Sequence, residues 1–199
     1  YSVNNSEWAS VAIGTEILFG GAKGDLRLRG TNINGTASGW YAYSTITFTE
    51  ANVNVACTGD IRTLLDWRIY NIVKTNNARF SYLFKDCAVL TSAPELPATT
   101  LADNCYDSMF LGCTSLTAAP KLPATKLAGD CYRYMFYGCT SLTSAPKLSA
   151  IELARACYYG MFSGCTSLVY APELPAKELA DNCYSDMFYG CTSLTSTPE

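Results

Sequence analysis

The sequence predicts an α/β repeat solenoid, right-handed, preceded by a small β-rich N-terminal domain. The main observation is a cysteine series with a period of 26 residues: Cys105, Cys131, Cys157 and Cys183. A second series has the same period: Cys87, Cys113, Cys139, Cys165 and Cys191. Residues 1–74 show no trace of this period. We therefore expect an N-terminal domain over 1–74 and about five stacked units over 75–199, the last of them incomplete.

Each unit is expected to contain one short helix and one strand. Apolar residues recur at steps of one, three and four, as on one face of a helix: Cys105, Tyr106, Met109, Phe110 and Cys113. Gly112 is of a type that commonly ends a helix. The Thr/Ser-rich segment 114–120 stops at a proline and suits a strand followed by a corner. Because so small a unit cannot bury its own apolar face, the units must stack, like residue on like residue.

Residues 1–74 carry signals of short strands. Segments 25–29 and 45–49 alternate apolar and polar residues, as half-buried strands do, and residues 61–67 resemble a short helix. We expect this domain to cap the first unit, whereas no polar unit caps the other end at Pro198-Glu199. The chain begins at Tyr1 without a signal segment, which predicts a processed product or a fragment of a longer repeat protein.

The composition argues against an enzyme. The 199 residues include no histidine, so neither a Ser-His-Asp nor a Cys-His nucleophile can form, and His-ligated zinc is excluded. With 14 Lys+Arg against 17 Asp+Glu, the chain has no basic surface for nucleic acid. No apolar run reaches the roughly 18 residues of a membrane span. We expect no cofactor and no metal.

The paired cysteines admit two main interpretations. Cys105 and Cys113 are eight residues apart, which is about 12 Å along a continuous helix and beyond the reach of a disulfide. In a continuous helix the cysteines therefore act as small buried hydrophobic residues that stack in a column from one unit to the next. If the helix ends early, near Gly112, disulfides within each unit become possible. A metal site is the least expected, because zinc ligands usually pair at two to four residues.

The repeat motif resembles a known family. Segments such as MFYGCTSLTSAP (residues 135–146) and GCTSLTSAPKLSA (residues 138–150) are similar to repeats of BspA-like bacterial surface proteins. The resemblance implies a leucine-rich-repeat solenoid that is secreted or exposed at the bacterial cell surface. It also implies adhesion to host proteins, other cells or matrix, and it supplies no catalytic residues. Similar repeats occur in proteins of bacterial viruses.

The variable columns of the units are the candidate recognition site. On the expected helix face opposite the Met-Phe stripe, they contain Tyr82, Arg133, Tyr134, Tyr137, Tyr159 and Tyr189. Tyr170 stands out on the expected strand side. Tyrosine offers a large contact area at low entropic cost, so these residues favour binding of a protein or glycan ligand, although an ordinary solvated face has the same polar character. The alternative is a structural subunit of a filament, surface layer or phage fibre that self-associates through its uncapped end.

Overall fold

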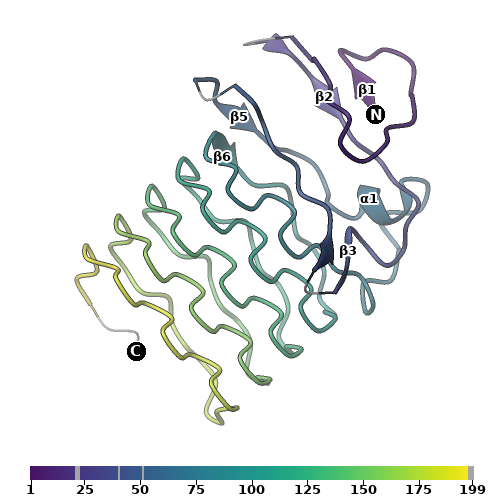
Figure 1. The fold of residues 1–199 in the computed structure, drawn as a ribbon. Coiled ribbons are helices and arrows are strands. Elements are labelled where there is room, and N and C mark those ends of the chain that lie inside the picture. The colour runs from purple at the N-terminus through teal and green to yellow at the C-terminus, as the bar shows by residue number, and fades with distance from the viewer. Residues whose placement is uncertain (21–22, 40, 51, 197–199) are drawn as a thin grey trace.

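The computed structural model describes residues 1–20, 23–39, 41–50 and 52–196. Figure 1 shows a row of parallel coils with the N-terminal region at one end. The end of the sequence at Pro198-Glu199 lies outside the described residues. Within them, the strands are β1 (Ser2–Val3), β2 (Leu26–Arg27), β3 (Ala37–Gly39), β4 (Ala42–Tyr43), β5 (Val55–Ala56) and β6 (Leu90–Ser92). The α-helix is α1 (Thr63–Asp66).

The prediction of an α/β repeat solenoid is wrong. The described units contain no α-helix, since α1 precedes them, and β6 is the one named strand that lies in a unit. The strands form three separate two-stranded sheets, β1-β2, β3-β4 and β5-β6, rather than one continuous parallel sheet. Elsewhere the units share isolated parallel bridges such as Ser92 with Ala118 and Ser144 with Tyr170. The prolines that recur in each unit lack the N–H that a longer ladder needs.

A chain of consecutive turns replaces the predicted helix. In the unit that begins at Cys105, every fourth residue has a left-handed backbone: Asn104 (φ 59°), Ser108 (φ 53°) and Gly112 (φ 73°). A right-handed helix cannot contain such residues. Asn, Asp and Gly accept this conformation at the lowest cost, which explains the glycine column that ends at Gly190. The apolar pairs therefore recur every four residues, and over nine residues that spacing is hard to distinguish from the 3.6 of a helix.

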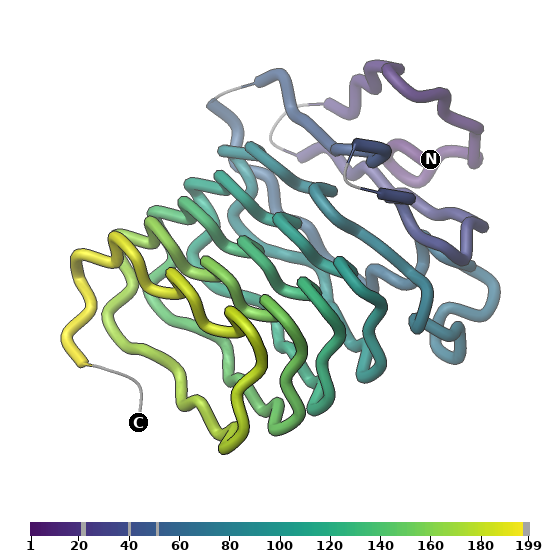
Figure 2. Tube along the Cα trace, turned by 60° about the horizontal axis from the view of Figure 1, so that its bottom comes forward, coloured from purple at the N-terminus to yellow at the C-terminus, as the bar shows by residue number. Residues whose placement is uncertain are grey.

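Backbone hydrogen bonds alternate between the unit itself and its neighbour. The N–H of Met109 donates to the carbonyl of Tyr106, three residues back, at 3.2 Å. The next N–H, of Phe110, donates to the carbonyl of Met135 in the following unit at 3.0 Å. The same alternation runs from Asn104 to Cys113 and recurs in the next two units. Figure 2 shows the resulting coils lying side by side. This pairing satisfies the buried polar groups of the backbone without helix or sheet.

Columns of identical side chains fill the interior. Phe136 lies between Phe110 and Phe162, with centroid distances of 5.6 and 5.7 Å and nearly parallel rings. Tyr132 lies in the same way between Tyr106 and Tyr158. These rings are almost fully buried, so burial of aromatic surface stabilises each interface between units.

All ten cysteines lie within the described residues and are free thiols. In the second series, Cys113 and the later cysteines donate to the carbonyl of a phenylalanine 29 residues back, as Cys139 does to Phe110 at 3.1 Å and Cys165 to Phe136 at 3.1 Å. Burial raises the pKa of Cys105 to about 12 and that of Cys157 to about 11. The thiols are therefore protonated core groups at neutral pH rather than nucleophiles.

The N-terminal region lies against the first unit. The N–H groups of Thr36 and Ile46 donate to the carbonyls of Arg79 and Leu83 at 2.8 and 2.7 Å, and β5 pairs in parallel with β6. The expected strand at 25–29 is represented by β2 alone, and no strand forms at 45–49. The expected helix at 61–67 is shortened to α1, whose Asp66 is salt-bridged to Arg68. The division at residue 74 stays a prediction.

Candidate recognition surface

Three consecutive units bring five side chains together on one side of the coils. We call this set the tyrosine patch: Arg133, Tyr134, Tyr137, Tyr159 and Asp186. The ring of Tyr134 contacts Tyr137 at 5.5 Å and Tyr159 at 5.3 Å between centroids, both edge to face. The hydroxyl of Tyr159 donates to the carboxylate of Asp186 at 3.0 Å. Each ring is thus held by a neighbour from its own or an adjacent unit, so the patch is ordered before any ligand arrives.

Arg133 joins the patch to buried charges beneath it. Its guanidinium carbon lies 4.7 Å from the ring centroid of Tyr134. The same group is 3.8 Å from the carboxylates of Asp107 and Asp130. Arg155 pairs with Asp130 at 2.6 Å. These contacts form a row of alternating charge: Asp107, Arg133, Asp130 and Arg155. Arg133 is therefore oriented both by its acidic neighbours and by the ring of Tyr134.

The pKa values of two groups in and around the patch, Asp107 and Tyr159, are shifted for different reasons. Burial raises the pKa of Asp107 to about 6, while a hydrogen bond from Ser108 and the charge of Arg133 oppose that rise. The hydrogen bond to Asp186 is the main cause that raises the pKa of Tyr159 to about 12. The Tyr159 hydroxyl thus remains a hydrogen-bond donor throughout the physiological range.

Gly160 makes room for the central ring of the patch. It has φ +57°, and a Cβ at this position would collide with Cε1 and Cδ1 of Tyr134. Other units place Tyr82, Ser108 and Asp186 at the equivalent left-handed position, so the conformation alone does not demand glycine. The need arises from the neighbouring tyrosine.

We expect Gly160→Ala to displace the Tyr134 ring and to destabilise the protein by only about 1 kcal/mol. Aromatic NMR signals of Tyr134, Tyr137 and Tyr159 report the displacement, and thermal denaturation reports the stability. Ser163→Ala, in the same unit, is the matched control. Unshifted tyrosine signals in Gly160→Ala would contradict this role for the glycine.

The structure groups some predicted site residues and separates others. Arg133, Tyr134, Tyr137 and Tyr159 form the patch, in which Tyr137 is 44% exposed. Tyr82 is half-buried and packs against Tyr43 at 4.5 Å. Tyr170 and Tyr189 are exposed at 67% and 75%, and no ring contact joins either of them to the patch within the described residues. Asp186 and Gly160 stand in the same variable columns, but their roles in the patch depend on neighbours in adjacent units.

The variable columns, expected on the exposed face because they lie opposite the buried Met-Phe stripe, are not exposed throughout. Ser81, Asp107 and Ser108 are buried. Ser81 and Ser108 satisfy their hydroxyl groups locally, by donating to the carbonyl of Asn104 and to Asp107. Burial is not confined to the first units, because Gly160 and Ser163 of the fourth unit are buried as well.

Comparison with protein-family models, curated proteins and solved structures finds no significant match. Among the described residues, no cluster of three or more Cys, Asp or Glu side chains is arranged to hold a metal ion. No helix in that part of the chain has the length and apolar character needed to cross a membrane.

Proposed function

We propose that this chain is a non-enzymatic recognition protein, secreted or exposed at a bacterial surface, that binds a protein or glycan through the tyrosine patch. The observation that carries the proposal is the grouping of Tyr134, Tyr137 and Tyr159 around Arg133. Tyrosine and arginine are the residue types that dominate binding hot spots. The resemblance of the repeat motif to BspA-like surface proteins supports the location and the adhesive role.

The physical basis of the proposal is preorganisation. Tyr134 is held on two sides by rings, and Tyr159 by a carboxylate. A ligand therefore does not have to order these side chains, which saves about 0.5–1.5 kcal/mol for each immobilised side chain. The phenol groups offer hydrogen-bond donors at the rim of an apolar surface, as both glycans and protein surfaces require.

We expect the triple variant Tyr134→Ala, Tyr137→Ala, Tyr159→Ala to lose at least tenfold in affinity for its ligand while its melting temperature changes little. The loss follows from removal of the contact surface, and the stability persists because the buried ring columns are untouched. A glycan array and a panel of immobilised matrix proteins provide the binding measurement. The control is Tyr41→Ala, which removes a fully exposed tyrosine outside the patch. Wild-type affinity in the triple variant would refute the site.

A further inference from the structure

A small pocket lies between the N-terminal region and the first two units. Its volume is about 180 Å³, and a cavity of about that size holds a molecule as large as benzene. Ligand sites often form where separate parts of a fold meet. We call it the polar pocket, and six residues line it: Gly39 of β3, Arg79, Ser81 and Tyr82 of the first unit, and Asn104 and Asp107 of the second.

The second unit supplies the polar pocket with buried acceptors. Asp107 is only 1% exposed. The hydroxyl of Ser108 donates to its Oδ1 at 2.8 Å, whereas its Oδ2 lies 3.8 Å from the guanidinium of Arg133, which is beyond hydrogen-bond distance. The side-chain oxygen of Asn104 is also buried and accepts no hydrogen bond within the described residues. Because buried acceptors without donors cost free energy, these groups suit a ligand that brings N–H groups.

The first unit supplies the polar pocket with a positive charge. The Nε of Arg79 donates to the carbonyl of Asp103 at 3.0 Å, and its Nη1 lies 3.5 Å from the carbonyl of Ser38. The guanidinium thus bridges the residues that precede Asn104 and Gly39 in the pocket lining. It forms no ion pair within the described part of the chain. Since a guanidinium has five N–H donors, further donors remain for an anionic group of a ligand.

Both charged residues of the polar pocket depart from the repeat. Arg79 stands in a column that otherwise contains cysteine alone: Cys105, Cys131, Cys157 and Cys183. Asp107 is the one acidic residue of its column, whose other members are Ser81, Arg133, Tyr159 and Ser185. The other units stack without these charges, so stacking does not account for them.

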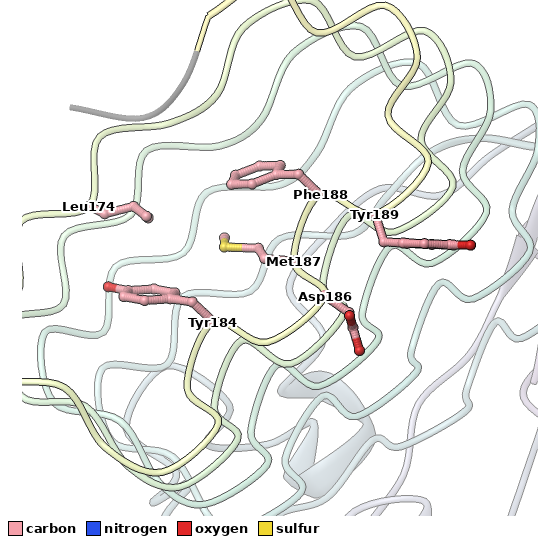
Figure 3. A pocket seen from close by; sticks show the side chains of 6 residues that line it. All are labelled: Leu174, Tyr184, Asp186, Met187, Phe188 and Tyr189. Carbon is pink, nitrogen blue, oxygen red and sulfur yellow. The ribbon is translucent and has the colours of Figure 1, made fainter.

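The polar pocket differs in kind from the larger hollow on the fifth unit. That hollow has a volume of about 430 Å³. Figure 3 shows four side chains turned toward it, whereas Asp186 and Tyr189 are directed away: Leu174, Tyr184, Met187 and Phe188. It offers mainly apolar contacts. The polar pocket is smaller, but it combines a carboxylate with a guanidinium.

We propose that the polar pocket binds a compact zwitterion, a free α-amino acid, with its ammonium group against Asp107 and Asn104 and its carboxylate against Arg79. The ammonium group supplies the N–H donors that the two buried oxygens lack. A carboxylate matches the planar fork of a guanidinium. The volume of the pocket restricts the ligand to a small side chain. This site is additional to the tyrosine patch and does not depend on the function proposed for that patch.

The charges around Asp107 make this binding depend on pH. Arg79 lines the same pocket, Arg133 favours the ionised carboxylate, and Asp130 and Tyr82 are its other ionisable neighbours. Burial raises the pKa of Asp107 to about 6. The ammonium group pairs with the ionised form, so the affinity is expected to be constant above pH 7. Below pH 6 it falls by up to about tenfold per pH unit, because the carboxylate must first lose its proton.

Titration of the isotope-labelled full chain, followed by nuclear magnetic resonance, tests the proposal. The probes are L-alanine and two analogues that each lack one charge, namely propionate and alaninamide. We expect L-alanine to shift the amide signals of Arg79, Tyr82 and Asp107 with a dissociation constant of about 1 mM or tighter. Each analogue is expected to bind at least tenfold more weakly. The comparison leaves the protein unchanged, so no effect on folding enters it.

A pair of variants assigns the ammonium contact. Asp107→Asn keeps the shape of the side chain but removes its charge, and it is expected to lower the affinity at least tenfold and to abolish the pH dependence. Asp86→Asn removes an exposed carboxylate outside the pocket and is expected to retain both.

Three results would overturn the proposal. The first is propionate or alaninamide binding as tightly as L-alanine, since one charge would then suffice. The second is unchanged affinity in Asp107→Asn. The third is the absence of any shift at about ten times the expected dissociation constant.

Discussion

Replacing Phe136 with alanine is expected to lower the free energy of unfolding by about 3–5 kcal/mol. The ring is fully buried and is stacked on both faces, by Phe110 and Phe162. The backbone on each side is held by hydrogen bonds between units, from Phe110 to Met135 and from Phe136 to Met161. The surrounding coils therefore cannot collapse into the space that the ring leaves, and the full cost of a cavity remains. Urea denaturation followed by circular dichroism measures the effect.

Two matched variants locate the cause of that loss. Tyr137→Ala removes a ring of similar size from the next residue, but this ring lies at the surface and is 44% exposed, so we expect a change of about 0.5 kcal/mol. Phe188→Ala removes a ring of the same column that, among the described residues, is stacked on one face only, and an intermediate loss is expected. Equal losses in all three variants would contradict the assignment of stability to the enclosed column.

The protein is expected to unfold cooperatively as the pH rises from about 9 toward 11–12. Burial raises the pKa of Cys87 and Cys157 to about 11 and that of Cys105 to about 12, from 9.0 for an unperturbed thiol. Below pH 9 the thiols are protonated in both the folded and the unfolded chain, so their contribution does not vary. Above it, the unfolded chain releases its protons first, and each buried thiol removes about 1 kcal/mol of stability per pH unit.

The thiol columns make this transition steep. Six of the thiols are entirely buried, namely Cys105, Cys113, Cys131, Cys139, Cys157 and Cys165, and their contributions add in the same direction. Burial also raises the pKa of Tyr106 and Tyr132 well above 10, which extends the loss to higher pH. Far-ultraviolet circular dichroism monitors the fold, and thiolate absorbance near 240 nm monitors ionisation.

The two signals are expected to change together, because the thiols ionise only when the units open. A titration between pH 7 and 8.5 serves as the control and leaves both signals constant. A chain that keeps its circular dichroism at pH 12, or whose thiolate signal appears well before unfolding, would show that the thiols are not enclosed as the structure has them.

The error in fold class has a specific physical origin. Apolar residues at Cys105, Tyr106, Met109, Phe110 and Cys113 fit both a helical face and a series of four-residue turns. What distinguishes the two is the backbone of Asn104, Ser108 and Gly112, which is left-handed in each case. Serine and tyrosine have no preference for that conformation, so the sequence signal is confined to Asn, Asp and Gly. These residues occupy two of the three left-handed positions in the second, third and fourth units and all three in the fifth.

The candidate site was predictable only as a set of columns. Tyr134, Tyr137 and Tyr159 were identified by residue type and variability within the repeat. Their mutual contacts depend on the outward direction of each turn and on the offset between neighbouring units. For the same reason the columns that contain Gly160 and Asp186 did not reveal what these two residues do, since each acts on a tyrosine one unit away.

The sequence by itself determined the 26-residue period, the register of the units and the identity of each interior column, because stacking requires like residues at the same position. The tertiary structure alone decided the backbone conformation and the direction of the hydrogen bonds. Successive N–H groups donate in turn to a carbonyl three residues back and to a carbonyl of the next coil, and this pattern requires the neighbouring coil to be in place.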